Sequence, residues 1–323
     1  MRRRDFFAVV LATTGANPLW AAEPNKVYRL ANAFPPMNPS GRFRYLDRLQ
    51  QLGYIEGKNL IIDRYVVEGS DYADLARAIA QAKPDVIGVG TDNQLISLVA
   101  KEAYPIPVVA LIPSVASGLV HNVNRPEGNI TGIFLDAGIE MQGKQLDILR
   151  QAVPSISRVA YLSNSNDWEG VWGHAIRDAG KASGISVIGI PLERSAAELE
   201  YRKAFETMAQ SSVQALVFNG LPPNLKYRSL IAELAAENRL PSIGWATDVV
   251  EEGHGLLSYA PDYSDLPDQL ADIIDRVLKG ARVSDIPVMQ PTKFILAINL
   301  KTAKALGLQI PPTLLAQADK VIE

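Results

Sequence analysis

The sequence predicts an α/β protein made of two doubly wound parallel-sheet domains joined by a three-crossover hinge. From residue 27 onward, short β-branched runs alternate with amphipathic helical stretches, which is the pattern of a parallel sheet with helices on both faces. The first series has apolar runs at 27–31, 60–66, 86–89, 108–112 and 130–135. A second series follows, with runs at 159–162, 187–190, 215–218 and 242–245. Two series of this kind indicate two sheets that face each other across a crevice.

A third tract indicates how the domains are connected. It contains strands at 256–260 and 294–298 and, between them, a helix with an apolar stripe of Leu266, Leu270, Ile273, Ile274 and Val277. Two simple domains in tandem have no need of this tract. It is explained if the chain crosses back to the first domain and then returns to the second.

These crossovers define the expected domain boundaries. We expect an N-terminal lobe of residues 23–135 plus 261–291 and a C-terminal lobe of residues 136–260 plus 292–323. The hinge should then lie near Asp136, Ala260 and Pro291.

The N-terminus has the three-part layout of an export signal. Arginines at positions 2, 3 and 4 precede an apolar run at 6–12, and small residues follow up to Ala21 and Ala22. We expect residues 1–22 to be a cleaved signal peptide and the mature chain to begin near Glu23 in the periplasm. The arginine pair before Asp5 also resembles a twin-arginine signal, so the twin-arginine and general export routes both stay open. No later stretch is long and apolar enough to span a bilayer.

Charge and composition exclude several classes of function. The formal net charge of −3 provides no basic field for a nucleic-acid backbone, so no nucleic-acid partner is expected. The chain has no Cys, which excludes disulfides, thiol catalysis, thiolate metal sites and a lipid anchor on Cys.

Sequence signatures of catalysis are weak. His121, His174 and His254 lie tens of residues apart without metal-ligand spacing, and neither a nucleophile elbow nor a phosphate-binding P-loop motif is present. We therefore expect no enzymatic activity, no cofactor and no metal. Gly88 and Gly90 follow a strand and precede a helix, but the third glycine of a dinucleotide fingerprint is missing. This turn is open to three interpretations: a phosphate-binding loop, a helix cap that faces a ligand, or a purely structural cap.

The candidate binding residues come from the loops that follow the predicted strands, because ligands of open α/β sheets bind outside the carboxyl ends of the strands. These loops carry amides, hydroxyls and aromatic rings, which suit a small polar ligand with a flat apolar part. The candidates are Asn32, Phe34, Thr91, Asp92, Asn93, Pro113, Ser114, Asn164, Ser165, Asn166, Trp168, Asn219, Trp245 and Asp248.

The loop chemistry favours a small organic acid or amino acid with an apolar or aromatic body. Its ring would stack on Phe34, Trp168 or Trp245. No Arg or Lys falls in these loops as predicted, so helix N-terminal amides and hydroxyls at Thr91, Ser114 or Ser165 would hold a carboxylate. Asp92 or Asp248 could pair with an ammonium group.

Four blocks of sequence resemble a known family. GYIEGKN at 53–59, RPEGNITG at 125–132, LSY at 257–259 and a closing block, PTKF at 291–294 with NLKTAKALGL at 299–308, are similar to the ABC transporter substrate-binding family that includes tryptophan- and tyrosine-binding members. The blocks span essentially the whole mature chain in the expected order. The third block adds Tyr259 to the candidate binding residues.

The resemblance implies a type I periplasmic-binding fold in which domain closure clamps a small-molecule ligand for the membrane permease of an ABC transporter. We expect a monomer. Two departures keep the ligand identity from being carried over: segment 34–40 lacks the His-Pro-Ala-Leu type of sequence, and segment 112–116 lacks the Gly-Asp-Pro-Val type.

Two other functions remain as alternatives. One is a soluble periplasmic sensor for a membrane receptor, which would need the same ligand-dependent closure. The other is an α/β hydrolase or isomerase with Asp92 or Asp248 as base, which the lack of a nucleophile-base pair disfavours.

Overall fold

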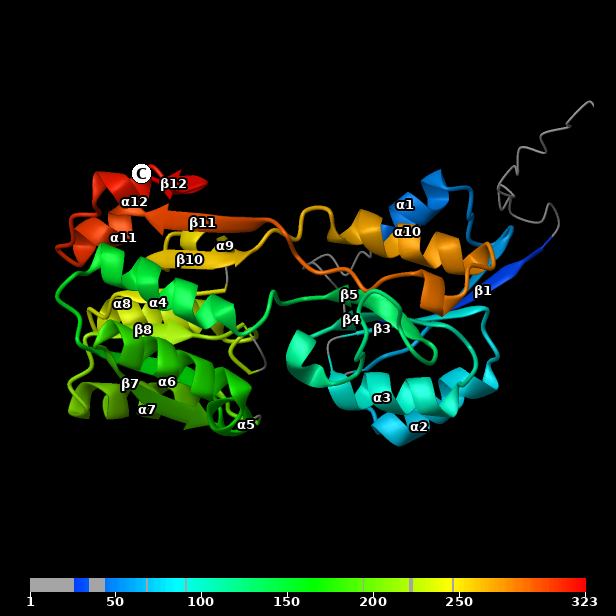
Figure 1. The fold of residues 1–323 in the computed structure, drawn as a ribbon, viewed down its shortest axis with the longest axis horizontal. Helices are drawn as coiled ribbons and strands as arrows, with labels where there is room; N and C mark the ends of the chain where they lie inside the picture. Colours follow the sequence, from blue (N-terminus) through cyan, green and yellow to red (C-terminus); the bar gives the residue numbers. More distant parts are fainter. Residues whose placement is uncertain are drawn as a thin grey trace, which may run out of the picture.

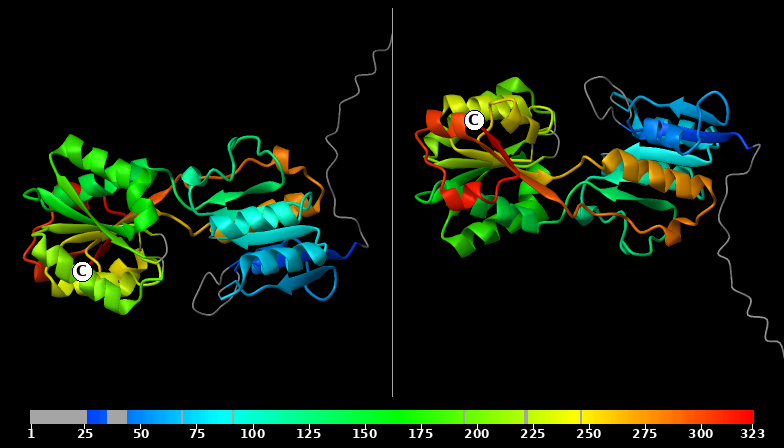
Figure 2. Two further views of the ribbon diagram at one scale, coloured as in Figure 1. Left: turned by 90° about the horizontal axis from the view of Figure 1, so that it is seen from below. Right: turned by 90° about the horizontal axis from the view of Figure 1, so that it is seen from above.

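The computed structural model describes residues 26–34, 44–67, 69–90, 92–193, 195–220, 223–245 and 247–323. The predicted signal peptide at 1–22, the expected start near Glu23 and the candidate Thr91 lie outside these residues. The described chain forms two α/β lobes, one beside the other, that are joined by several linker segments (Figure 1). The views from above and below show the same separation (Figure 2).

The first lobe is a parallel sheet with the strand order β2-β1-β3-β4-β5. Its strands are β1 (Tyr28–Ala33), β2 (Leu60–Arg64), β3 (Val86–Gly90), β4 (Val108–Ile112) and β5 (Ile130–Phe134). Its helices are α1 (Arg44–Gln51), α2 (Tyr72–Gln81) and α3 (Asn93–Glu102), with a short 3₁₀ turn η1 at Val115–Ser117. All five residues of β3, β4 and β5 are buried, as expected for strands covered on both faces.

The second lobe has a larger sheet with the strand order β12-β11-β10-β9-β8-β6-β7. Its strands are β6 (Arg158–Asn164), β7 (Ser186–Leu192), β8 (Ala215–Phe218), β9 (Ser242–Gly244), β10 (Leu257–Pro261), β11 (Phe294–Asn299) and β12 (Lys320–Ile322). Its helices are α4 (Glu140–Ala152), α5 (Ser165–Glu169), α6 (Val171–Ser183), α7 (Glu198–Gln210), α8 (Arg228–Glu237), α9 (Thr247–Glu251), α11 (Leu300–Ala305) and α12 (Pro312–Leu315).

One strand pair departs from the parallel pattern. β11 runs antiparallel to β10, with Ser258 opposite Ala297, whereas the other pairs of this sheet are parallel. The reversal follows from the path of the chain, because β10 leaves the second lobe at the edge where β11 enters it.

Helix α10 (Leu266–Leu278) packs on the first lobe although it lies between two strands of the second. Its residues Leu270 and Ile274 are fully buried in the cluster that contains Leu30 of β1 and Leu49 of α1. The chain then passes along β5, where Met289 donates its amide to Gly132 (2.9 Å). The apolar stripe read from the sequence is therefore the face that anchors this excursion.

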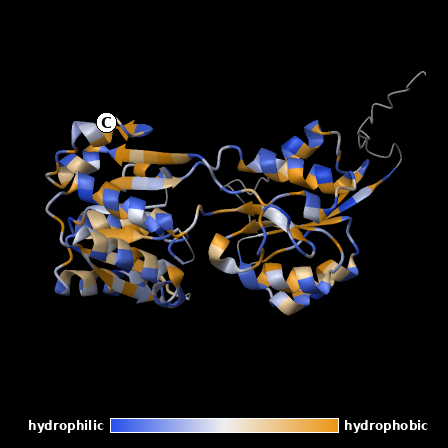
Figure 3. Ribbon diagram, in the orientation of Figure 1, coloured by the Kyte–Doolittle hydropathy of each residue, from blue (hydrophilic) through white to orange (hydrophobic). Residues whose placement is uncertain are grey.

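The chain thus crosses between the lobes three times, at 135–139, 262–265 and 290–293. The predicted fold class is confirmed: two α/β domains with mostly parallel sheets and three connections. Apolar residues gather on the strands and on the inner helix faces, while polar residues cover the outer helix faces (Figure 3).

Candidate functional site

The carboxyl ends of β1 to β10 point toward the opposite lobe, whereas β11 and β12 run the other way. β5 leads directly into the first crossover, and β10 leads directly into the second. Because parallel strands end at the same edge of a sheet, the loops after β1, β3 and β4 lie on the side of the first lobe that faces the second. The loops after β6, β8 and β9 lie on the matching side of the second lobe. This is the position where open α/β folds bind ligands.

A buried network of amides lies at this edge of the second lobe. Asn224 is 1% exposed, and its Nδ2 donates to the carbonyl of Leu162 (2.8 Å) and to Oδ1 of Asn219 (3.0 Å). The hydroxyl of Tyr201 donates to Oδ1 of Asn224 (3.0 Å). Asn219 in turn donates through Nδ2 to Oδ2 of Asp167 (3.0 Å). The network fixes the end of β6 and the loop after β8 relative to each other.

Asn164 completes this network from the end of β6. Its Oδ1 accepts the amide of Asp167 (2.9 Å), which caps α5, and its Nδ2 donates to Oδ2 of the same residue (2.5 Å). The two predicted residues Asn164 and Asn219 therefore converge on one half-buried carboxylate. Two side-chain amides thus donate to one oxygen of Asp167 and hold it in place.

An aromatic pair follows the end of β9. The rings of Trp245 and Trp172 meet edge to face with centroids 6.3 Å apart. Trp245 lies against Gly220, where a β-carbon would approach its Cβ to 2.8 Å. The Trp245 ring is half-buried, and its Nε1 is buried without a hydrogen-bond partner among the described residues. An unpaired buried donor is costly, so this ring is the best placed of the predicted stacking residues to gain a partner.

Asp248 is paired with Arg228, a residue outside the predicted strand-end loops. Nε of Arg228 donates to Oδ2 of Asp248 (2.9 Å), and Nη2 lies 2.8 Å from the same oxygen. Nη1 donates to the carbonyl of Leu225 (3.0 Å). Asp248 therefore already faces a cation, which disfavours its expected roles as base or ammonium partner. A guanidinium thus lies at the strand-end edge, although no Arg or Lys falls within the predicted strand-end loops themselves.

Phe34 does not offer a stacking surface in the structure. Its ring is 2% exposed, packs over Gly88 and Gly90, and meets Tyr45 edge to face with centroids 5.4 Å apart. Because Gly88 and Gly90 have no side chains, they leave the space on β3 that the ring fills. The expectation that Phe34 stacks on a ligand is corrected, because the ring belongs to the first-lobe core. Asn32 is also buried and accepts the amide of Phe34 (3.2 Å), while its Nδ2 has no partner among the described residues.

The amides after β4 are already satisfied by side chains. Ser114 Oγ accepts the amide of Ala116 (3.0 Å) and caps the 3₁₀ turn η1. Oδ1 of Asp136, from the first crossover, accepts the amide of Val115 (3.0 Å). The expectation that these amides hold a ligand carboxylate is therefore corrected. Pro113 is half-buried beside Ser114.

Asp136 is itself an unusual group, since it is a carboxylate that is only 1% exposed. Burial raises the pKa of Asp136, although the hydrogen bonds that it accepts oppose this effect. Its Oδ2 is buried with no partner within hydrogen-bond distance among the described residues. The first hinge segment therefore starts with Asp136, a carboxylate that is shielded from solvent by its packing against the first lobe.

Asp92 caps α3. Its Oδ1 accepts the amides of Gln94 (2.9 Å) and Leu95 (3.2 Å), while the neighbouring Asn93 is exposed. Of the three interpretations of this turn, the geometry favours the structural cap, because the amides that would hold a phosphate are used by Asp92.

Trp168 packs under α6 instead of facing the first lobe. Its ring lies over Gly189 of β7, and the guanidinium of Arg177 lies 4.2 Å from the ring centroid. The expected stacking role is corrected, since both faces of the ring have protein neighbours. On the same short helix, Ser165 donates to Glu193 (3.5 Å) and Asn166 is exposed.

Tyr259 belongs to the hinge strands. Its ring stacks on Phe294 with centroids 5.5 Å apart and an interplanar angle of 24°, and its carbonyl accepts Nε2 of Gln145 (3.0 Å). Burial raises the pKa of Tyr259. The residue therefore joins β10 to β11, where the chain leaves and re-enters the second lobe.

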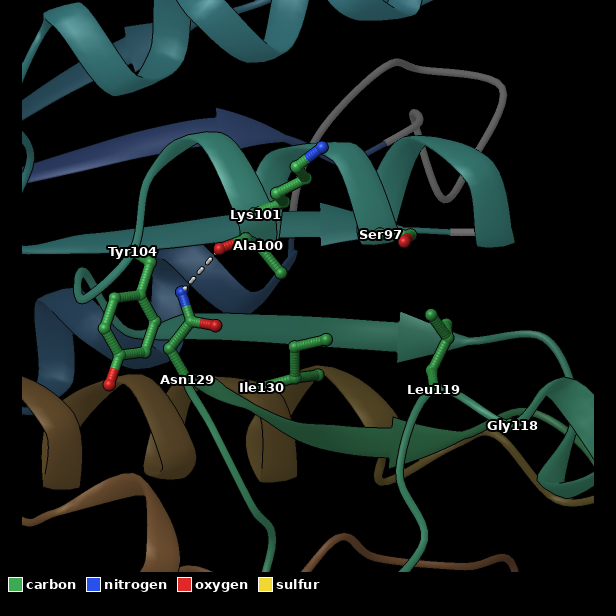
Figure 4. A pocket seen from close by; sticks show the side chains of 8 residues that line it. All are labelled: Ser97, Ala100, Lys101, Tyr104, Gly118, Leu119, Asn129 and Ile130. Atoms are coloured by element: carbon green, nitrogen blue, oxygen red, sulfur yellow. Dashed lines mark hydrogen bonds between the residues drawn. The ribbon is translucent and has the colours of Figure 1, made fainter.

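A separate hollow of about 520 Å³ lies on the first lobe beside α3 (Figure 4). Lys101 and Tyr104 come from α3 and its end, and Asn129 donates to the carbonyl of Ala100 (3.1 Å). Asn129 and Ile130 lie at the amino end of β5, so this part of the hollow is remote from the strand-end edge. None of the predicted binding residues lines it.

No helix in the described part of the chain is both long and apolar enough to cross a membrane. The described residues also contain no group of three or more His, Asp or Glu side chains placed to hold a metal ion.

Three residues of this edge were not found from the sequence: Asn224, Trp172 and Arg228. Each lies beyond the first few residues after its strand, whereas the binding residues were expected in the loops that directly follow the strands. Arg228 follows the end of β8 by ten positions. An Arg at the first position of a helix that follows a buried strand is the signal that could have identified it.

The comparison with known proteins decides the family. The model of the family described as ABC transporter substrate binding protein matches residues 44–322. This chain belongs to that family. The ABC substrate-binding protein is similar to a tyrosine-binding protein of Clostridioides difficile, with 23% identity over 275 residues that cover 82% of this chain and 76% of the relative.

Solved structures share the fold of this ABC substrate-binding protein. A conserved domain protein from Vibrio cholerae superimposes with a TM-score of 0.79 and 22% identity, covering 92% of this chain and 100% of that one. An ABC domain from Streptococcus pneumoniae in complex with L-Trp has a TM-score of 0.78 and 23% identity, covering 91% and 99%. The resemblance read from the sequence blocks is thus confirmed at the level of the family.

Proposed function

We propose that this substrate-binding protein captures a small organic acid or amino acid with an apolar or aromatic body and delivers it to the permease of an ABC importer. The observation that carries the proposal is the Trp245–Trp172 pair beside the Asn164–Asp167–Asn219 network, both at the strand-end edge that faces the first lobe. Together they offer an aromatic surface next to fixed polar groups, which is what such a ligand requires.

The mechanism is a closing motion at the three crossovers. In the described chain the hinge is held by backbone pairing of β10 with β11 and by the bond from the Tyr263 hydroxyl to the carbonyl of Leu135. A ligand that bridges the two lobes can contact both of them at once only in the closed state. Binding therefore shifts the population toward that state. The permease would then recognise the closed arrangement of the two lobes.

The ligands for which two similar proteins are named agree with this ligand class. One relative is named for tyrosine and a similar structure holds L-Trp, and both compounds carry a carboxylate, an ammonium and an aromatic body. Of the three rings predicted to stack, Trp245 is the one whose position supports the proposal.

We further propose the setting in which the protein works. Export through the signal at 1–22, by either route, would place the mature chain in the periplasm as a monomer without cofactor or catalytic activity. We retain the boundaries 23–135 plus 261–291 and 136–260 plus 292–323 for the two lobes.

Two measurements test this proposal. Native mass spectrometry of the purified protein, followed by release of any bound compound, should identify a small acid or amino acid. Calorimetry with amino acids, aromatic acids and sugars should show binding in the first two groups, and small-angle scattering should show compaction on binding. Tight binding of a neutral sugar alone would contradict the ligand class.

Uptake separates import from sensing. Deletion of the gene should abolish uptake of the bound compound, and expression of the full-length protein should restore it. Unchanged uptake together with a lost transcriptional response to the compound would favour the periplasmic sensor.

A further inference from the structure

The guanidinium of Arg228 lies at the strand-end edge of the second lobe, while the expected anchors Ser114 and Ser165 already have partners within the protein. Arg228 is the first residue of α8, which follows β8, so it lies at the carboxyl end of that strand. Its side chain is 36% exposed. The position and the exposure leave it accessible from the space between the lobes.

The described caps at the other strand ends already have partners within the protein. Asp136 accepts the amide of Val115, Ser114 accepts that of Ala116, and Asn164 accepts that of Asp167. Asp92 accepts the two amides at the start of α3. A ligand carboxylate at any of these positions would have to displace a side-chain cap, so recognition by a free donor is favoured.

Arg228 retains such donors. A guanidinium has five N–H groups in a planar fork. Nε and Nη2 both lie within 2.9 Å of one carboxylate oxygen of Asp248, and Nη1 donates one N–H to the carbonyl of Leu225. Within the described residues one N–H on each terminal nitrogen therefore remains, and both can donate to the oxygens of a ligand carboxylate.

The pairing with Asp248 orients this fork without blocking it. Asp248 is 46% exposed, and half-exposed ion pairs of this type contribute little to stability, so the guanidinium can share its charge with a second anion. Asp248 thus acts as a positioning residue.

We propose that Arg228 is the carboxylate anchor of the ligand and that Asp248 positions its guanidinium. This inference rests on the proposed function, and it adds that the ligand must carry a carboxylate or an equivalent planar anion. An amide in place of the carboxylate should be rejected, because the amide nitrogen would face an N–H donor.

The test compares ligand pairs that differ only in this group. Calorimetry would use L-tryptophan against L-tryptophanamide and benzoate against benzamide as probes. For the mature wild-type protein we expect the carboxylate of a pair to bind at least about tenfold more tightly than its amide. In Arg228→Gln this preference should disappear, with amide binding changed by less than about twofold. Arg228→Lys should retain part of it, since the charge remains but the fork is lost.

Two further variants separate recognition from folding. Asp248→Asn should keep or increase the preference for the carboxylate, because it removes the competing anion. Arg202→Gln is the matched control: Arg202 also places Nε (2.9 Å) and Nη2 (2.7 Å) on one carboxylate oxygen, that of Glu198, but lies on α7 outside the site. This control should leave binding unchanged.

The outcomes distinguish the two proposals. If wild-type protein binds a carboxylate probe and Arg228→Gln binds it equally well, or loses the carboxylate and its amide equally, the Arg228 inference is wrong and the proposed function stands. Equal wild-type affinity for a carboxylate and its amide would also overturn it. If the wild type binds neither these carboxylates nor any other acid of the panel, the proposed ligand class fails and the inference fails with it.

Discussion

The ring of Phe34 occupies the space that a β-carbon on Gly88 would need. An ideal β-carbon at Gly88 would overlap the ring edge, with Cδ2 only 3.0 Å away. Phe34 directly follows β1, and Gly88 lies in β3, the neighbour of β1 in the sheet, so the pair joins two adjacent strands near their ligand-facing ends. A glycine here is thus required by packing.

We predict that Gly88→Ala destabilises the first lobe by about 1–3 kcal/mol, because the ring has to move within a closed core. Urea unfolding followed by circular dichroism measures this change. Gly143→Ala is the matched control: Gly143 lies in α4 with its nearest neighbour, Ala179, at 3.7 Å, so added helix propensity should stabilise by about 0.5–1 kcal/mol. Equal stability of Gly88→Ala and wild type would contradict the packing argument.

Trp245 and Trp168, both predicted to stack on the ligand, should have different roles. Trp245→Ala should lower ligand affinity by about 1–3 kcal/mol if its ring contacts the ligand in a desolvated cleft. Trp168→Ala removes a ring between Gly189 and Arg177, and should lower the free energy of unfolding by about 2–4 kcal/mol while leaving affinity nearly unchanged. Calorimetry and urea unfolding of both variants check this pair. Loss of affinity in Trp168→Ala alone would reverse the assignment.

The buried amide network predicts a large effect from one substitution. Asn224→Ala removes three hydrogen bonds, leaves the Tyr201 hydroxyl buried without its acceptor, and leaves the Leu162 carbonyl with only the longer bond from the amide of Asn219 (3.4 Å). We expect a loss of about 2–4 kcal/mol in the free energy of unfolding. The exposed Asn166, in the same region, is the control, and Asn166→Ala should change stability by less than about 0.5 kcal/mol. Similar effects in both variants would contradict a structural role of the network.

The fold could be predicted because burial leaves a periodic trace in the sequence. The run 86–90 is apolar apart from its glycines because both faces of β3 are covered, and the stripe at Leu270 and Ile274 marks the face of α10 that packs on the first lobe. The sequence did not predict that β11 is antiparallel to β10, because the direction of a strand depends on the edge of the sheet at which the chain enters.

For the binding site, the sequence predicted only its position, at the edge of each sheet where the parallel strands end. Strand-end position predicted that Asn164 and Asn219 lie at one edge of the sheet, but not that both contact the carboxylate of Asp167. It also could not show that oxygens of Ser114 and Asp92 accept hydrogen bonds from neighbouring backbone amides. The orientation of the Phe34 ring likewise depends on the two glycines beneath it. These hydrogen bonds and packing contacts depend on the distances between segments of the chain, which residue types alone do not determine.

Asp136 should make stability depend on pH. Burial raises its pKa in the folded protein above the ordinary value of about 3.9 that applies to the unfolded chain. Between these two values the folded state binds more protons than the unfolded state, so stability falls as pH rises through this window and stays lower above it. Asp136→Asn keeps the acceptor for Val115 and removes the charge. We expect it to be at least as stable as wild type at neutral pH and to lack this decline, measured by urea unfolding from about pH 4 to about pH 8.

Glu56 provides the opposite case. The hydrogen bond from Arg64 lowers the pKa of Glu56, so its contribution is present at neutral pH and is lost as pH falls through the folded-state value. Glu56→Gln should therefore weaken the dependence at acid pH without affecting the decline assigned to Asp136. If Asp136→Asn shows the same pH profile as wild type, the desolvation of Asp136 is not the cause.

The hinge contact between Tyr263 and Leu135 should control how freely the lobes move. The hydroxyl of Tyr263, from the second crossover, donates to the carbonyl of Leu135 in the first, so it ties two of the three linkers together. Tyr263→Phe removes this bond and keeps the ring, which should cost about 0.5–1.5 kcal/mol of local stability. We expect faster amide hydrogen exchange at 135–139 and 262–265, with the exchange of β3 and β8 unchanged. Tyr104→Phe, at an exposed tyrosine beyond the end of α3, is the control and should leave all these rates unchanged. Exchange that accelerates equally in both variants, or in neither, would show that the linkers move independently of the Tyr263 hydroxyl.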